Sequence, residues 1–291
     1  MSDLNGINLA MQTPMRDDGS IDYVRWEALI DTYIDAGVHG LVLGAGTGQH
    51  PYLTREECDG LYEIGAKRID GRCNLICQTS ALVVDEVIER SQHAQDLGAD
   101  ALMILPPYLE GPEDDDGLFE FYRQIDARVE VDIIGYNIPQ TTGIGISLEL
   151  FKRLNQLDHF NYIKDSGGDM TTHQEYLATG YKVLNGCDPI TVFALMAGAE
   201  GCIWDGANYM PRESVQLYQL VTSGDHAAAM ALWARMIPSL LYIWRGYYIP
   251  KVKAASRLRG FDGGAVRTPL RNLDAAAEQE LASYLKPLDQ D

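Results

Sequence analysis

A short pattern that recurs along the chain constrains its fold more than any other feature. In each copy a helical stretch ends at a glycine, a few linking residues follow, and a short apolar run begins. The copies read D-A-G-V-H-G-L-V-L at 35–43, D-L-G-A-D-A-L-M-I at 96–104 and M-A-G-A-E-G-C-I-W at 196–204. Gly37, Gly98 and Gly198 fit the left-handed position that often ends a helix. Since the apolar runs do not alternate with polar residues, they are typical of strands buried on both faces of a parallel sheet.

The same pattern predicts eight strands, at 6–12, 40–46, 74–79, 100–106, 131–137, 161–165, 182–187 and 201–205. Amphipathic stretches separate most of them, and Thr54 and Ser147 are typical helix caps. Strands that alternate with helices imply right-handed crossovers and a parallel sheet. We therefore predict an α/β fold, a (β/α)8 TIM barrel at 1–224, with an open doubly wound sheet as the alternative. Helical patterns without strands predict a C-terminal helical domain at 225–291.

Composition narrows the classes of partner. The formal net charge is −19, which disfavours binding to nucleic acid or to an anionic membrane. No stretch approaches the roughly 18 consecutive apolar residues of a membrane-spanning helix, and the N-terminus does not resemble a secretion signal. The five cysteines and six histidines show no metal-binding spacing. We expect a cytoplasmic protein with reduced thiols and no metal.

Two residues at the ends of neighbouring strands form the strongest chemical signal. Tyr136 closes the run V-D-I-I-G-Y, and Lys164 closes the run N-Y-I-K. Reactive groups of a (β/α)8 barrel gather at the carboxyl ends of its strands, so these side chains should meet over a substrate. A neutral lysine amine can attack a ketone to form an imine, and a phenol can carry the proton that this attack releases. Tyr108, after Pro106-Pro107, is a second candidate for the proton relay.

A glycine cluster follows the second predicted strand, G-A-G-T-G at 44–48. It is not a dinucleotide-binding motif, because G-x-G-x-x-G would need glycine where Gln49 stands, which disfavours a nicotinamide oxidoreductase. Exposed N–H groups in such a loop can instead hold one carboxylate.

Several motifs are similar to those of one family. The sequence resembles the dihydrodipicolinate synthase / N-acetylneuraminate lyase family of class I aldolases over essentially its whole length. The matching segments are A-G-T-G-Q-H-P-Y-L-T-R-E-E (45–57), P-P-Y (106–108), Y-N-I-P-Q-T-T-G (136–143), I-K-D-S-G-G-D (163–169), N-G-C-D (185–188), G-C-I-W-D-G-A-N-Y-M-P (201–211) and I-P-K-V-K-A-A (249–255). The K-D-S-G-G-D segment and the R-T-P-L tail look most like the 4-hydroxy-2-oxoglutarate aldolase branch.

The resemblance implies a TIM barrel with a C-terminal helical domain, assembled as a homotetramer (a dimer of dimers). It implies that Lys164 forms a Schiff base with pyruvate or another 2-oxo acid, without a cofactor. Tyr136 would be the acid/base, and Tyr108 would be a relay tyrosine lent across a dimer interface. Gly46 and Thr47 match the positions whose backbone binds the carboxylate of the 2-oxo acid. Ile203 matches a position whose main chain lies near the imine.

Three departures from the family pattern bear on the proton relay or on the substrate. Gly46 removes a hydroxyl that normally joins the tyrosine relay. Thr141 stands where the synthase branch carries an arginine that binds the carboxylate of aspartate semialdehyde, which argues against a role in lysine biosynthesis. Pro189 follows Asp188 where the sialic-acid branch usually has a glutamate, which argues against N-acetylneuraminate.

Together these observations predict a class I aldolase that makes or breaks a carbon–carbon bond beside a pyruvate-derived enamine. Its partners would be a 2-oxo acid and an aldehyde. The compound that it cleaves would be a hydroxylated 2-oxo acid, such as 4-hydroxy-2-oxoglutarate or a 2-keto-3-deoxy sugar acid. Four side chains are weaker candidates for holding the rest of the substrate: Thr141, Thr142, Asp188 and Asp205. The alternatives are a dehydratase or hydratase-aldolase on a 2-keto-3-deoxy acid with the same imine chemistry, and a non-catalytic 2-oxo acid binder.

Overall fold

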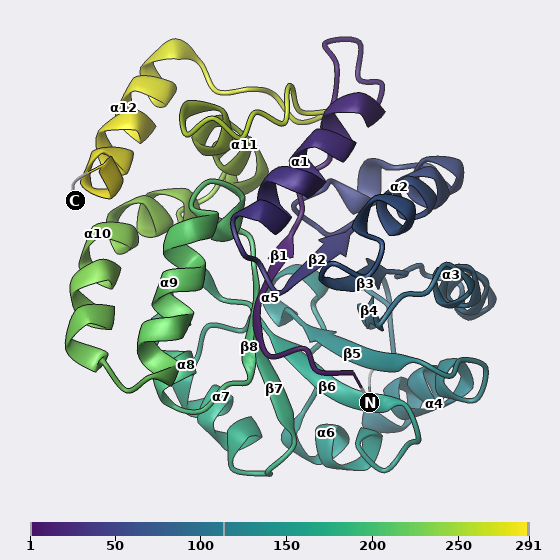
Figure 1. Ribbon diagram of the computed structural model, residues 1–291. Helices are drawn as coiled ribbons and strands as arrows, with labels where there is room; N and C mark the ends of the chain where they lie inside the picture. Colours follow the sequence, from purple (N-terminus) through teal and green to yellow (C-terminus); the bar gives the residue numbers. More distant parts are fainter. Residues whose placement is uncertain (1, 113, 290–291) are drawn as a thin grey trace.

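The computed structural model describes residues 2–112 and 114–289. Its centre is a closed barrel of eight parallel strands, in which each strand pairs with the next along the chain and β8 pairs with β1 (Figure 1). The strands are β1 (Gly6–Ala10), β2 (Gly40–Leu43), β3 (Asn74–Gln78), β4 (Ala101–Ile104), β5 (Asp132–Asn137), β6 (Phe160–Asp165), β7 (Lys182–Asn185) and β8 (Gly201–Trp204). Each begins at or next to its predicted first residue, so the predicted barrel is confirmed and the open sheet is wrong.

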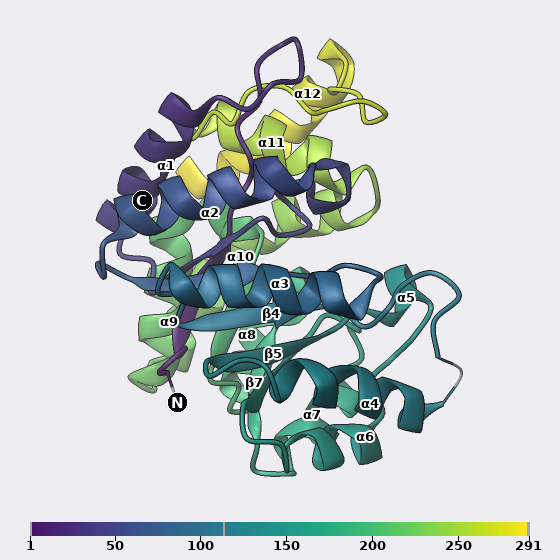
Figure 2. The same cartoon turned by 90° about the vertical axis from the view of Figure 1, so that its right-hand side faces the viewer.

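Helices surround the barrel and return the chain to the start of the next strand (Figure 2). They are α1 (Tyr23–Asp35), α2 (Arg55–Ile69), α3 (Val84–Asp96), α4 (Asp115–Asp126), α5 (Pro139–Thr142), α6 (Leu148–Leu154), α7 (Met170–Leu177), α8 (Thr191–Met196) and α9 (Pro211–Thr222). Thr54 forms the predicted capping box, and Ser147 accepts a hydrogen bond from the N–H of Leu150 at 3.0 Å. Gly37, Gly98 and Gly198 have φ of 88°, 87° and 108°, as their place after a helix requires.

Alternation of side chains along the strands directs the reactive residues inward. On β5, Ile134 and Tyr136 belong to the cluster inside the barrel, whereas Ile133 packs in the layer between strands and helices. On β6, Tyr162 belongs to the inner cluster, and Lys164, two residues later, points to the same side. Tyr136 and Lys164 are direct partners in the β5–β6 register. The fold thus brings these two residues together at the carboxyl ends of adjacent strands.

Three more helices follow the barrel: α10 (His226–Trp244), α11 (Tyr248–Leu258) and α12 (Ala275–Leu285), drawn in green to yellow in Figure 1. They lie in the region predicted to be helical, and we propose the domain boundary between 224 and 225, in the loop before α10. The outer ends of the two proposed domains, residues 1 and 290–291, lie outside the described residues.

Helix α10 is long and apolar enough to cross a membrane by length and composition alone, contrary to the expectation from the sequence that no stretch approaches this length. Its residues Leu232, Met236, Leu240 and Ile243 are buried, and it packs against α9 and α12. We interpret it as a core helix of the C-terminal extension.

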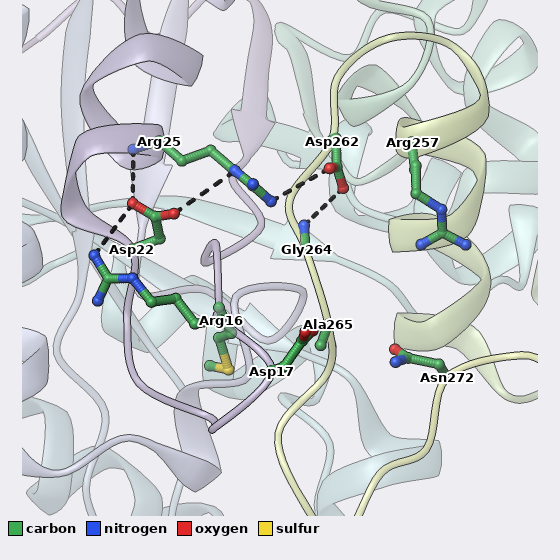
Figure 3. A pocket seen from close by; sticks show the side chains of 10 residues that line it. Arg16, Asp17, Asp22, Arg25, Arg257, Asp262, Gly264, Ala265 and Asn272 are labelled. Atoms are coloured by element: carbon green, nitrogen blue, oxygen red, sulfur yellow. Dashed lines mark hydrogen bonds and ion pairs between the residues drawn. The ribbon is translucent and has the colours of Figure 1, made fainter.

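Charged residues join the start of the barrel to the loop that follows α11 (Figure 3). Arg25 on α1 forms an ion pair with Asp262 at 3.3 Å, and Asp22 accepts the backbone N–H of Arg25 at 3.1 Å. Asp262 also accepts the backbone N–H of Gly264 at 2.8 Å, which fixes the turn of the loop. Because these groups are partly exposed, the pairs orient the loop more than they stabilise it.

A buried lysine holds the same loop from within. The Nζ of Lys253 on α11 donates to the carbonyl oxygens of Thr13, Gly263 and Ala265, at 2.8, 3.1 and 2.5 Å. Burial lowers the pKa of Lys253 to about 7, while three carbonyl acceptors match the three protons of an ammonium group. Lys253 therefore connects the barrel, α11 and the loop through one side chain.

Replacing Lys253 by methionine is expected to lower the free energy of unfolding by about 3–5 kcal/mol, because three buried carbonyls lose their donor. Urea denaturation measures this loss. Lys251→Met is the matched control, since the Nζ of Lys251 reaches one carbonyl, that of Tyr242 at 2.8 Å, and its side chain is only partly buried. Equal losses in the two variants would contradict the structural role given to Lys253.

Candidate active site

Lys164 and Tyr136 meet at the carboxyl end of the barrel. The Nζ of Lys164 lies 4.0 Å from the centre of the Tyr136 ring, and the two residues are 2% and 9% exposed. Among the described residues no carboxylate forms an ion pair with Lys164. A lysine amine that lies beside a tyrosine in a buried site is placed to attack a carbonyl group. The sequence prediction that these side chains meet is therefore matched by the geometry.

A cavity of about 560 Å³ opens beside the pair. Its volume suits a small molecule, and its wall mixes apolar side chains with a few polar groups. The lining residues are Gly46, Thr47, Pro51, Tyr52, Gln78, Leu105, Tyr136, Ile138, Gln140, Thr141, Lys164, Gly186, Asp205, Trp244, Tyr248 and Ile249. Lys164 is the single basic residue among them.

Two residues of the glycine loop after β2, Gly46 and Thr47, line this cavity. In the described part of the chain, the N–H groups of Gly46 and Thr47 have no hydrogen-bond partner. A Cβ added at Gly46 would meet no atom within 4 Å, so the space beside this residue is open. Adjacent free N–H groups are suited to hold a carboxylate.

Two aspartates and a tyrosine form a hydrogen-bonded group at the same cavity. The hydroxyl of Tyr248 lies 2.6 Å from Oδ2 of Asp188 and 2.9 Å from Oδ2 of Asp205. The hydroxyl of Thr47 donates to Oδ1 of Asp205. Asp188 is 1% exposed, whereas Asp205 and Tyr248 are partly exposed and line the cavity. We call Asp188, Tyr248 and Asp205 the acid–tyrosine–acid group.

If both contacts of the Tyr248 hydroxyl are hydrogen bonds, this group holds two protons: one on the phenol and one on a carboxyl. A phenol carries one proton, so it can donate in only one of its two contacts, and the other contact needs a proton on a carboxyl. Burial, and then repulsion from Asp205, raise the pKa of Asp188 to about 8. Burial and the two carboxylates also raise the pKa of Tyr248. The consistent arrangement is that Asp188 donates to Tyr248 and Tyr248 donates to the carboxylate of Asp205.

The other residues predicted from the sequence differ in whether they line the cavity beside Lys164 and Tyr136. Thr141 lines the cavity, whereas Thr142 is buried and its hydroxyl lies 2.7 Å from the carbonyl of Ile144. Ile203 is 1% exposed and belongs to the cluster inside the barrel. Tyr108 lies in the loop after β4 and is not among the lining residues. The roles of these four residues stay predictions.

Sequence reasoning missed the contribution of the C-terminal extension. Trp244, Tyr248 and Ile249 line the cavity, although they belong to α10 and α11 and not to the barrel. The motif I-P-K-V-K-A-A at 249–255 was a signal that this segment matters, but it gave no indication that Tyr248 reaches the strand ends. Gln140, on the short helix α5, was also missed; its side chain donates to the carbonyl of Ser166 at 2.7 Å.

Comparisons with known proteins show what the chain is similar to over nearly its whole length. A family model described as the Dihydrodipicolinate synthetase family matches residues 3–288. The chain is 30% identical over 284 residues to the 4-hydroxy-tetrahydrodipicolinate synthase of Phenylobacterium zucineum, covering 97% of this chain and 96% of the relative. It is also 30% identical over 302 residues to an uncharacterised DapA-like lyase of Pyrobaculum islandicum, covering 98% of each. A solved structure from Pseudomonas aeruginosa, described as a candidate dihydrodipicolinate synthetase, matches with a TM-score of 0.94 at 32% identity, over 98% of this chain and 99% of that one.

Proposed function

Because the chain belongs to the dihydrodipicolinate synthetase family, we propose that it cleaves or forms a carbon–carbon bond of a hydroxylated 2-oxo acid, with pyruvate as the shared product or donor. Enzymes of this family are lyases with class I aldolase chemistry, which use a lysine Schiff base with pyruvate and no metal or organic cofactor. The proposal adds the type of substrate and the residues that act on it. It rests on one observation, the buried amine of Lys164 over the ring of Tyr136 beside a cavity of ligand size.

The proposed reaction begins when the neutral amine of Lys164 attacks C2 of the 2-oxo acid. The carbinolamine loses water, and Tyr136 supplies and removes the protons that this step needs, leaving an iminium ion. In the cleavage direction Tyr136, which has given its proton to the departing water, takes the proton of the C4 hydroxyl, and the C3–C4 bond breaks. Its electrons flow into the iminium to give an enamine, and an aldehyde leaves. Protonation of the enamine at C3 and attack of water on the iminium release pyruvate and restore the amine.

The backbone of the glycine loop is proposed to hold the carboxylate of the substrate. Gly46 and Thr47 line the cavity that Lys164 also lines. A carboxylate held there would place the adjacent ketone carbon near the amine, which converts a bimolecular attack into an oriented one.

The named relatives do not fix the substrate. The Phenylobacterium zucineum protein is described as a 4-hydroxy-tetrahydrodipicolinate synthase, but Thr141 lines this cavity where the synthase branch has an arginine. We therefore propose a substrate other than that of the synthases, either 4-hydroxy-2-oxoglutarate or a 2-keto-3-deoxy sugar acid.

Dehydration is the second candidate, and the acid–tyrosine–acid group favours it. A proton held by Asp188 and passed through Tyr248 can assist the departure of a hydroxyl from an enamine. Product analysis separates the two reactions, because cleavage releases pyruvate and an aldehyde whereas dehydration keeps the carbon skeleton whole.

We also propose that the enzyme works as a homotetramer in the cytoplasm. Analytical ultracentrifugation tests the oligomeric state, and localisation of the protein in cells tests the compartment.

Trapping with borohydride tests the imine directly. Incubation with pyruvate and sodium borohydride is expected to add one covalent pyruvate-derived group to the intact protein, and peptide mapping is expected to place it on Lys164. Protein treated with borohydride alone is the control for nonspecific reduction. Absence of an adduct, or an adduct on another lysine, would remove the basis of the proposed function, and it would favour a non-catalytic 2-oxo acid binder.

A further inference from the structure

The distribution of charge around the cavity bears on which of the proposed substrates fits. A 2-oxo acid presents its first carboxylate to the N–H groups of Gly46 and Thr47. A substrate with a second carboxylate would need another cation, because burying an unpaired charge is unfavourable. The only basic lining residue is Lys164, which the imine occupies. Thr141 offers a hydroxyl and no charge.

The acid–tyrosine–acid group adds negative charge to the same wall. Asp205 accepts hydrogen bonds from both Thr47 and Tyr248, which hold its carboxylate in place at the cavity wall. Asp188, which is buried, has its Oδ1 without a hydrogen-bond partner among the described residues. A carboxylate that faces a cavity accepts hydrogen bonds from hydroxyl groups and repels other carboxylates.

We infer that Asp205, held in place by Tyr248 and Thr47, selects a substrate whose second part is an uncharged hydroxylated chain and rejects one that ends in a second carboxylate. This inference rests on the proposed imine chemistry and goes beyond it, since it decides between the two substrate types left open above. A 2-keto-3-deoxy sugar acid fits the site, and 4-hydroxy-2-oxoglutarate does not.

Trapping with two 2-oxo acids of equal length tests this selection, whether the enzyme cleaves or dehydrates its substrate. The probes are 2-keto-3-deoxygluconate, with an uncharged hydroxylated chain, and 2-oxoadipate, with a second carboxylate. The concentration that gives half-maximal adduct on Lys164 under borohydride is measured for each. The native enzyme is expected to need about 100-fold more 2-oxoadipate than 2-keto-3-deoxygluconate, as like-charge repulsion in a buried site implies.

Three variants test whether Asp205 causes the discrimination between the two probes. Asp205→Asn keeps the shape of the side chain and removes its charge, so the ratio of half-maximal concentrations is expected to fall to about tenfold or less. Asp188→Asn replaces a neutral acid by a neutral amide that can still donate to Tyr248, so most of the discrimination is expected to remain. Asp96→Asn, at the exposed end of α3, makes the same charge change away from the cavity and is expected to alter neither concentration.

The outcomes separate this inference from the proposed function. If pyruvate is trapped on Lys164 but the native enzyme discriminates less than about threefold, the imine chemistry stands and the selection by Asp205 is wrong. An Asp205→Asn ratio equal to the native ratio overturns it as well. Failure of the native enzyme to trap pyruvate removes the proposed function itself. Circular dichroism checks that Asp205→Asn is folded, and Asp205→Ser gives a second uncharged variant if it is not.

Discussion

Replacing Lys164 by alanine is expected to lower kcat/KM by at least about 10⁴-fold and to abolish trapping of pyruvate. The amine is the proposed nucleophile of the first step, and no other residue that lines the cavity has a side-chain amine to form an imine in its place. Steady-state kinetics with the best substrate and intact-mass measurement after borohydride treatment provide the two readouts. The expected loss is the largest of any single substitution in this chain.

The chain contains a matched control for this experiment. Lys182 on β7 lies 4.7 Å from the centre of the Tyr162 ring and donates to the Tyr162 hydroxyl at 2.8 Å, so it forms a second lysine–tyrosine pair on neighbouring strands. Lys182 is the first residue of its strand, whereas Lys164 is near the end of its own, and so the two pairs lie at opposite ends of the barrel. Lys182→Ala is expected to trap pyruvate like the native protein. Residual trapping in Lys164→Ala, or loss of trapping in Lys182→Ala, would contradict the assignment.

Replacing Tyr136 by phenylalanine is expected to lower kcat by about 10²–10³-fold while the adduct on Lys164 still forms, more slowly. The ring that packs over the amine remains, but the hydroxyl that moves protons during imine formation is lost. A fall in kcat with little change in KM distinguishes this role from a contribution to binding alone. Quenched-flow trapping with borohydride follows the rate of imine formation separately from turnover.

Tyr162→Phe provides the control for the loss of a buried hydroxyl. Tyr162 is two residues before Lys164 on the same strand and also faces the inside of the barrel, but its hydroxyl donates to the carbonyl of Ser2 at 2.6 Å. This change is expected to affect stability and not the rate of imine formation. Near-native kcat in Tyr136→Phe would show that another group, such as Tyr108 of a neighbouring subunit, carries the proton.

The sequence predicted the barrel well because its signals are local. Each signal spans about ten residues: a glycine ends a helix, and an apolar run then starts a buried strand. Because side chains alternate strictly along a strand, this pattern also places Lys164 and Tyr136 inside the barrel. The apolar character of α10 was overlooked because a single charged residue, Arg235, interrupts it.

The acid–tyrosine–acid group was only partly predictable. Asp188 and Asp205 were identified because they follow strands, where reactive residues of such barrels gather. Tyr248 could not be placed, because it belongs to a helix of the C-terminal extension and reaches the cavity only through tertiary packing. The sharing of a proton among the three residues depends on distances of a few ångström, which spacing along a sequence does not reveal.

The placement of Tyr248 divides two tasks between separate parts of the polypeptide. Strands β5 and β6 carry the groups proposed to make and break covalent bonds, while helix α11 carries Tyr248, whose hydroxyl donates to Asp205. Substitutions in and around α11 are therefore expected to change which compounds the cavity accepts without disturbing Lys164. Laboratory evolution of new specificities should begin with libraries at positions 244, 248 and 249, before the barrel itself is varied.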